Sequence, residues 1–148
     1  FFLLGKNSLA TGIGEILEEI ELPKFWYVII NPGFPLSTRE VYQDKNLDLT
    51  KKKVGINIPS LAKSLKTPSL IKRLLYNDLE KIVFKRYPGL RDIKRLLIER
   101  GAAGSLLSGS GSTVFGLILE RGPARKAYEL LLKDSERNNW TIILAQGL

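Results

Sequence analysis

The sequence has no cysteine, no histidine and no methionine among its 148 residues. Without cysteine, disulfides, thiolate metal sites and thiol catalysis are excluded within this chain. Without histidine, imidazole general-base catalysis and histidine-ligated zinc are excluded as well. Any catalysis here must therefore use Asp, Glu, Lys, Ser, Thr or Tyr side chains, backbone amides, or a partner.

Long apolar runs are also lacking, because no segment approaches the ~20 apolar residues that a membrane span needs. The opening stretch, residues 1–4, is apolar but has neither the basic flank nor the cleavage site of a signal peptide. We therefore expect a cytoplasmic protein with no membrane partner. Since the chain begins with Phe1 and contains no Met, we expect either that its N-terminus was removed or that it is a piece of something longer.

The composition, 44% hydrophobic and 26% charged, fits one globular domain that can bury a core. The net charge of +8 is concentrated in residues 51–100, which carry 14 basic and 4 acidic side chains. Such a block can attract phosphate, nucleic acid or an acidic surface. The simpler interpretation is a set of solvated helix faces, with Lys51, Lys52 and Lys53 in an exposed loop.

Apolar spacing and turn residues predict the secondary structure. A continuous aromatic and β-branched run at 25–30 indicates a buried strand, and Thr67-Pro68 indicates a helix start that an apolar helical spacing continues to Pro88-Gly89. Before that helix we expect an extended segment at 54–58 and a brief helix after Pro59. After it we expect a helix ending at Gly101, strands at 105–107 and 113–119, and a final strand at 140–144. Between the last two strands, Gly122-Pro123 opens a helix with Ala127, Leu130 and Leu131 on one face. From residue 25 onward this is the order of an α+β, ferredoxin-like split βαβ fold.

The small-residue loop Ser108, Gly109, Ser110, Gly111 and Ser112 joins two of these strands. Its glycines permit positive φ, so successive N–H groups could face an oxyanion, and the serines add hydroxyl donors. It does not match a Walker loop or the dinucleotide-binding pattern, and a strand rather than a helix follows it. A hairpin turn and a phosphate-binding loop both remain open. If the loop binds phosphate, at least one glycine should have positive φ, and the loop should lie on the same side as Thr38 and Tyr42.

Two further stretches carry polar groups in suggestive positions. Residues 31–42 follow the first buried strand as a loop rich in hydroxyl, ring and charged groups, where binding residues often collect. By themselves these residues favour a plain connection, with Tyr42 packed on the core. Residues 77–80, Asn-Asp-Leu-Glu, lie within the long expected helix. Their polar groups are expected to form a helix face or to hydrogen-bond a neighbouring loop.

Together, these stretches resemble the C-terminal half of the 4-diphosphocytidyl-2-C-methyl-D-erythritol kinase family, which belongs to the GHMP superfamily of small-molecule kinases. The similarity extends over nearly the whole chain. The Ser-Gly-Ser-Gly loop indicates the superfamily, whereas the Ser-Thr-x-x-Val-Tyr stretch and the opening Phe-Phe-Leu block point to this family within it. The matching stretches are Phe1–Gly5 with Ala10–Glu15, Ile30–Gly33 with Ser37–Tyr42, Asn77–Glu80 with Tyr87-Pro88, and Leu107–Gly116.

The resemblance implies ATP-dependent phosphorylation of the 2-hydroxyl of the cytidylyl-methylerythritol substrate, in the non-mevalonate route to isoprenoid precursors. It implies that residues 1–22 are the tail end of an N-terminal kinase lobe and that residues 23–148 are the ferredoxin-like C-terminal domain. The family's catalytic Asp and Lys and its ATP loop would lie upstream of Phe1, so no catalytic residue is expected in this chain. ATP and Mg²⁺ would be bound mainly by that missing lobe, which is also the expected partner, and no metal site is expected here.

By the same resemblance, Tyr42 would stack on the cytosine ring and Thr38 would hydrogen-bond in the same pocket. The loop from Ser108 to Ser112 would back and shape the phosphate-binding region. The isolated chain is accordingly expected to be inactive.

Two other interpretations stay open. A free-standing basic ferredoxin-like domain could bind nucleic acid, but the sequence lacks the basic-Gly-aromatic signature that such sheets use for stacking bases. The C-terminal lobe of another GHMP kinase, of the homoserine or mevalonate type, would keep the glycine-rich loop. That alternative does not account for the Ser-Thr-x-x-Val-Tyr stretch.

Overall fold

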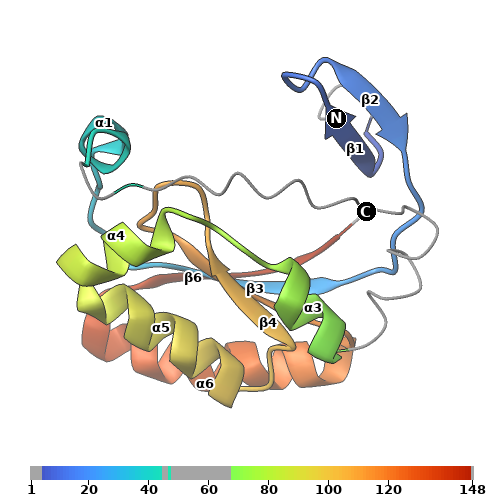
Figure 1. Cartoon of the computed structure of the whole chain (residues 1–148). Helices are drawn as coiled ribbons and strands as arrows, with labels where there is room; N and C mark the ends of the chain where they lie inside the picture. Colours follow the sequence, from blue (N-terminus) through green and yellow to red (C-terminus); the bar gives the residue numbers. More distant parts are fainter. Residues whose placement is uncertain (1–4, 45–46, 48–67, 148) are drawn as a thin grey trace.

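The computed structural model describes residues 5–44, 47 and 68–147, and residues 25–147 hold an antiparallel sheet packed against helices. Figure 1 shows α5 and α6 covering one face of this sheet, with α1 and a small hairpin on the opposite side. The elements are β1 (Ser8–Thr11), β2 (Ile16–Glu19), β3 (Trp26–Asn31), α1 (Thr38–Tyr42), α3 (Pro68–Leu74), α4 (Glu80–Arg86), α5 (Pro88–Glu99), β4 (Gly104–Leu107), β5 (Val114–Ile118), α6 (Arg121–Asn138) and β6 (Thr141–Gln146).

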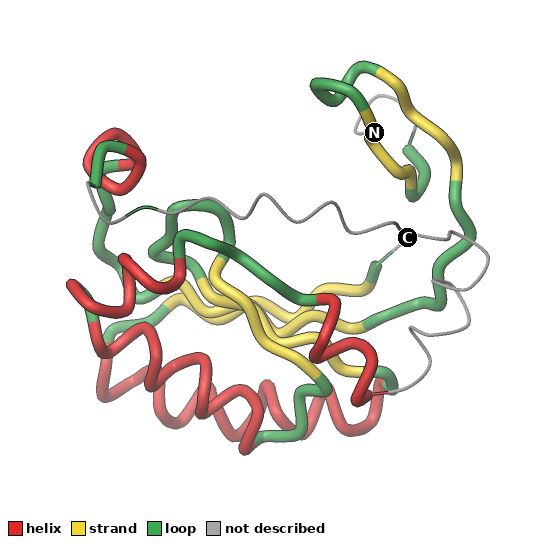
Figure 2. The backbone as a smooth tube through the Cα atoms, viewed as in Figure 1, coloured by secondary structure: helices red, strands yellow, loops and turns green. Residues whose placement is uncertain are grey.

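The strand order in the main sheet is β4-β5-β3-β6, and every pairing is antiparallel. The first strand of the unit, β3, lies between the third and the fourth, as in the split βαβ arrangement. Figure 2 shows the long helices α5 and α6 along one face of this sheet. The α+β, ferredoxin-like expectation is therefore confirmed, and the predicted strands at 25–30, 105–107, 113–119 and 140–144 correspond to β3, β4, β5 and β6 within one or two residues.

The core lies between the sheet and the helices. Val28, Ile30 and Val114 on the strands and Ala124 and Leu131 on α6 are all fully buried. Leu90, Ile93 and Leu97 place the apolar stripe of α5 in the same cluster. The stripe recurs at three- and four-residue intervals, which is the spacing that puts side chains on one helix face. Of the three apolar residues expected on one face of α6, Ala127 and Leu131 are buried and Leu130 is half-buried.

The expectation of one long helix from residue 67 to residue 87 is wrong. Two helices, α3 and α4, are separated by residues 75–79. The break occurs at Asn77, whose side-chain oxygen accepts a hydrogen bond from the Leu79 amide at 3.0 Å. Asparagine side chains compete with helical hydrogen bonding in this way, and the apolar spacing does not reveal it because Ile71, Leu79 and Ile82 remain in phase across the break.

Pro88 was expected to end the preceding helix, and in the structure it also lies in the first turn of α5. Its fixed φ suits that position, and its missing N–H has no intrahelical acceptor there. The expected extended segment at 54–58 and the helix after Pro59 lie outside the described residues, as does Thr67 at the expected helix start.

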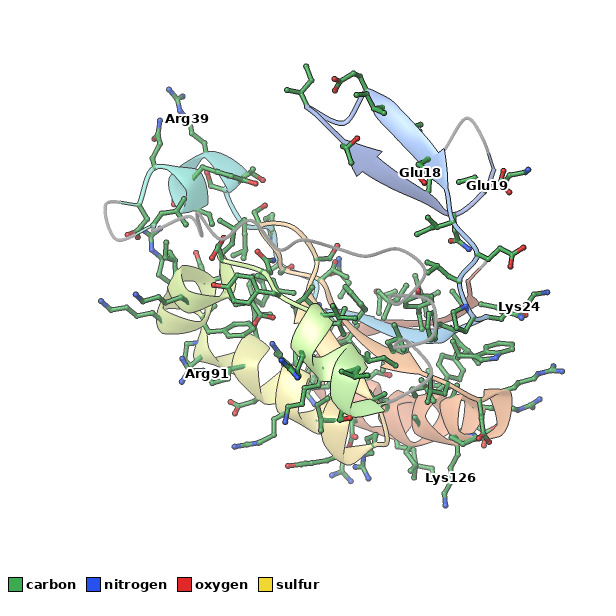
Figure 3. The ribbon with its side chains drawn as sticks, turned by 45° about the vertical axis from the view of Figure 1, so that its right-hand side comes forward. Glu18, Glu19, Lys24, Arg39, Arg91 and Lys126 are labelled. Carbon is green, nitrogen blue, oxygen red and sulfur yellow. The ribbon has the colours of Figure 1, made fainter. Side chains whose placement is uncertain are left out.

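Most of the described basic side chains in residues 51–100 are exposed, and two are half-buried and ion-paired. Lys81, Lys85 and Arg91 are all exposed to solvent. In Figure 3, Arg91 on α5 and Lys126 on α6 extend away from the sheet. These residues agree with the interpretation of solvated helix faces, whereas residues 51–53 lie outside the described part of the chain.

The segment before residue 25 forms a separate two-stranded hairpin, in which β1 pairs with β2 from Ser8↔Glu19 to Thr11↔Ile16. Ile13 at its turn is 99% exposed and Ile16 is 58% exposed. Figure 1 shows this hairpin standing off the four-stranded sheet. The backbone is extended here, as expected, while the assignment of residues 1–22 to another lobe stays a prediction. Within the described part of the chain, no helix is both long enough and apolar enough to cross a membrane.

Candidate functional site

A pocket of about 470 Å³ opens where three connections meet at the end of the sheet. The end of α1 contributes Tyr42, and the connection between α3 and α4 contributes residues 76–79. The end of β4 and the start of the glycine-rich loop contribute residues 106–109, and β5 contributes Phe115. Residues far apart in the sequence therefore line one pocket.

The aromatic side chains give this pocket accessible ring surface. Tyr42 is 55% exposed and Tyr76 is 66% exposed. The expectation from the residues alone, that Tyr42 packs on the core, is therefore wrong, because the core contact of α1 is made by the buried Val41. Phe115 is half-buried and packs edge-on against Tyr27, with ring centroids 6.0 Å apart. Burial raises the pKa of the Tyr27 hydroxyl above its ordinary value.

The glycine-rich loop has the backbone geometry that its glycines predict. Gly109 has φ 55° and Gly111 has φ 92°, both in the region that disfavours other residues. A Cβ on Gly111 would lie 2.8 Å from Leu36 Cδ1, whereas a Cβ on Gly109 would meet open space. The prediction of positive φ is thus confirmed for both glycines.

The loop lies on the side of Thr38 and Tyr42, as expected. The Thr38 and Ser110 hydroxyls are 2.8 Å apart, and Ser108 and Gly109 line the same pocket as Tyr42. The described residues lining this pocket do not include Thr38 itself. Thr38 therefore links α1 to the loop next to the pocket, and its proposed contact with substrate stays a prediction.

The remaining loop residues hold the loop in shape. Gly111 N donates to Ser108 O at 2.9 Å and Ser108 N donates to Thr113 O at 2.9 Å. Ser112 is buried, and its hydroxyl donates to the Phe34 carbonyl. This hydroxyl serves an internal contact, so Ser108 and Ser110 are the two loop serines with side chains at or beside the pocket.

Asn77 and Glu80, to which no site role was assigned from the sequence, contact the end of β4 and the glycine-rich loop. Asn77 Nδ2 donates to the carbonyls of Leu107 and Gly109, at 2.9 and 2.8 Å. Glu80 Oε1 accepts from Leu107 N at 2.9 Å, and its other oxygen pairs with Lys94. The hydrogen bond to a neighbouring loop that was one expectation for residues 77–80 is confirmed. Its partners lie about thirty residues away, where no local signal could identify them.

Tyr76 and Asp78 complete the polar part of the wall, with the Tyr76 hydroxyl donating to Asp78 Oδ1 at 2.7 Å. Within the described residues, no group of three or more Asp and Glu side chains is placed to hold a metal ion.

The split βαβ fold is shared by many functional classes, so the class of this chain is identified by its similarity to known families. The sequence model described as "GHMP kinases C terminal" matches residues 48–134, which is more than half of the chain. The chain belongs to this family.

A 4-diphosphocytidyl-2-C-methyl-D-erythritol kinase of Geotalea daltonii is 48% identical over 136 residues, covering 92% of this chain and 47% of the relative. Among solved structures, a 4-(cytidine 5'-diphospho)-2C-methyl-D-erythritol kinase matches with a TM-score of 0.71 and 27% identity. The match covers 99% of this chain and 52% of that one. This chain spans about half the length of the curated relatives it matches.

A homoserine kinase of Cytophaga hutchinsonii matches with a TM-score of 0.59, 24% identity, and coverage of 89% of this chain and 45% of that one. At this identity, the match shows the shared fold alone. It does not favour homoserine as a substrate.

Proposed function

We propose that this chain supplies the substrate side of a kinase that phosphorylates the 2-hydroxyl of 4-diphosphocytidyl-2-C-methyl-D-erythritol with ATP. The single observation that carries the proposal is the shared pocket of Tyr42 and Gly109. An exposed aromatic ring can stack on a base, and a polar loop nearby suits the phosphates carried by the ribose of the same nucleotide. The names of the relatives support this choice of substrate over homoserine or mevalonate.

In the proposed reaction, the 2-hydroxyl oxygen forms a bond to the γ-phosphorus of ATP. The bond from that phosphorus to the β–γ bridging oxygen breaks, ADP leaves, and the hydroxyl proton passes to a base. Such transfers depend mainly on alignment and charge stabilisation. We assign the base, the main ATP contacts and Mg²⁺ to the upstream lobe, and the alignment of the cytidylyl group to this chain.

Within this chain, the ring of Tyr42 would hold the cytosine, and the loop beginning at Ser108 would face the attached phosphates. Thr38 would contribute through its contact with Ser110, which joins α1 to the loop. The positive φ of Gly109 and Gly111 supports a loop shaped for close approach of a ligand to backbone.

The test compares the complete gene product with residues 1–148 alone. The complete protein should phosphorylate the cytidylyl substrate in preference to homoserine and mevalonate, as measured by ADP release and product mass. The isolated chain should show only background turnover, because the groups that supply most of the electrostatic stabilisation would be missing. Preferential phosphorylation of homoserine or mevalonate would contradict the substrate assignment, and substrate-dependent turnover by the isolated chain would contradict the division of labour.

A further inference from the structure

We propose that Asn77 is a positioning residue that sets the conformation of the glycine-rich loop toward the phosphates of the bound nucleotide. The inference rests on the proposed function, because it assigns the phosphates of a cytidine diphosphate group to the loop side of the pocket. It concerns the residue that orients this loop.

The side chain of Asn77 is held at both ends. Its Nδ2 donates to Leu107 O at 2.9 Å and to Gly109 O at 2.8 Å. Its Oδ1 accepts from Leu79 N at 3.0 Å. Both amide hydrogens and the amide oxygen are thus engaged, which fixes the plane of the group. The half-buried Asn77 therefore forms a rigid link between the start of α4 and the loop.

The hydrogen bond from Asn77 to the Leu107 carbonyl satisfies a backbone group at the edge of the sheet. Among the described residues, β4 is an edge strand, so none of them forms a strand that pairs with the backbone groups of Leu107 facing away from β5. Asn77 provides a donor for the Leu107 carbonyl, and Glu80 provides an acceptor for the Leu107 amide. Lys94 pairs with Glu80 in turn. Two side chains therefore take the place of a neighbouring strand at the point where β4 becomes the loop.

The bond to Gly109 O has the larger consequence for a ligand. The peptide joining Gly109 to Ser110 is planar and trans, so its carbonyl and its N–H point in opposite directions. Holding the Gly109 carbonyl toward Asn77 fixes the direction of the Ser110 amide. The Ser110 hydroxyl is fixed separately by Thr38, at 2.8 Å. Asn77 and Thr38 together therefore determine how Ser110 is presented beside the pocket.

This arrangement predicts a difference between ligands with and without phosphates. A cytidine ring on Tyr42 does not need the loop, whereas a diphosphate extending toward Gly109 does. Asn77→Asp keeps an oxygen for Leu79 N but removes the donor and sets a negative charge against two carbonyls. The variant should therefore weaken binding of CDP while leaving binding of cytidine almost unchanged.

The experiment measures inhibition constants of CDP and cytidine against the cytidylyl substrate, using the complete gene product. Inhibition constants do not depend on what fraction of the enzyme is folded, so a merely structural role would not move them. Asn77→Asp should raise the inhibition constant for CDP about tenfold, a size expected for the loss of two hydrogen bonds and the placement of a charge against two carbonyls. The constant for cytidine should change less than about twofold.

Asn138→Asp is the matched control, because Asn138 makes the same kind of side-chain bond, to Asp134 O at 2.8 Å, at the end of α6. It should leave both constants unchanged. If Asn77→Asp does not fold, Asn77→Ala replaces it in the experiment. Asn77→Ala should raise the inhibition constant for CDP about threefold, because it removes the donor without adding charge.

Equal constants in Asn77 variants and the unaltered protein, or equal weakening of CDP and cytidine, would overturn the inference. The proposed function is tested separately by the unaltered protein. If the unaltered protein does not phosphorylate the cytidylyl substrate, the proposed function fails and the inference falls with it. If it does and the CDP constant is insensitive to Asn77, only the inference fails.

Discussion

The helix-covered face of the sheet and the pocket at its end are held together by different interactions. On the helix-covered face, fully buried apolar side chains such as Val28, Val83 and Leu131 pack in one cluster. At the pocket, the large side chains Tyr42 and Tyr76 are exposed, and polar side chains bond to backbone groups of distant loops. The first region provides stability through buried area, and the second provides geometry through a few directional bonds.

The free energies of apolar burial and of hydrogen bonding explain why the two regions should respond differently to substitution. Burying a leucine or isoleucine side chain stabilises the fold by about 1.5–3 kcal/mol. A typical internal hydrogen bond contributes about 0.5–1.5 kcal/mol net. Losing one contact at the pocket should therefore alter the loop without unfolding the domain. Losing one core side chain should lower stability while leaving the pocket intact in the molecules that remain folded.

The largest effect on stability is expected from Leu131→Ala on the covered face. Leu131 is fully buried under the sheet, so its truncation removes apolar contact and leaves a cavity. The free energy of unfolding should fall by about 2–5 kcal/mol, measured by urea denaturation. Leu132→Ala is the control on the same helix, since Leu132 is 37% exposed, and its effect should be clearly smaller. Equal losses in the two variants would contradict the assignment of the core.

Gly111→Val tests the boundary between the two regions, because Gly111 belongs to the loop and contacts the core. The backbone at φ 92° is strained for valine, and the new Cβ would lie 2.8 Å from Leu36 Cδ1. We expect a stability loss of about 1–3 kcal/mol together with reduced activity of the complete gene product. Gly122→Ala is the control, because nothing lies within 4 Å of the Cβ that it adds. Its unfolding midpoint should remain unchanged or rise slightly, since alanine restricts the unfolded chain more than glycine does.

Tyr42→Ala should have the smallest effect on stability and a selective effect on binding. More than half of the ring surface is already exposed, so its removal takes little from the core. Loss of one stacking face should weaken binding of the cytidylyl substrate by about 1–3 kcal/mol, by analogy with single stacked bases. The KM for that substrate should rise while the KM for ATP stays nearly constant, and Tyr42→Phe should be much milder. An unchanged substrate KM in Tyr42→Ala would remove Tyr42 from the proposed site.

Much of the fold follows from local patterns in the sequence. The apolar run at 25–30 forms β3 because its β-branched and aromatic side chains suit a buried strand. The turn residues between 107 and 114 separate β4 from β5, and Gly109 and Gly111 adopt the positive φ that only glycine adopts easily. The order of these elements is sufficient to predict the split βαβ arrangement.

The pocket could be predicted only in part. The resemblance pointed to Tyr42 and the loop as site residues, but the exposure of the Tyr42 ring and its common pocket with the loop depend on how α1 and β4 meet in space. Asn77 was placed inside a helix because its neighbours keep a helical apolar spacing. Its true role depends on carbonyls of Leu107 and Gly109 that the folded chain brings to it.

The sequence by itself determined the four strands of the main sheet, the helices α5 and α6, and where glycine must bend the chain, because these choices depend on side chains a few residues apart. Tertiary structure alone decided that Asn77 holds a distant loop and that Thr38 contacts Ser110. Hydrogen bonds between distant segments carry no periodic signal, since each needs only one donor and one acceptor brought together by packing elsewhere. The helix-covered core therefore follows from pattern, and the pocket follows from the way that core sets its connections side by side.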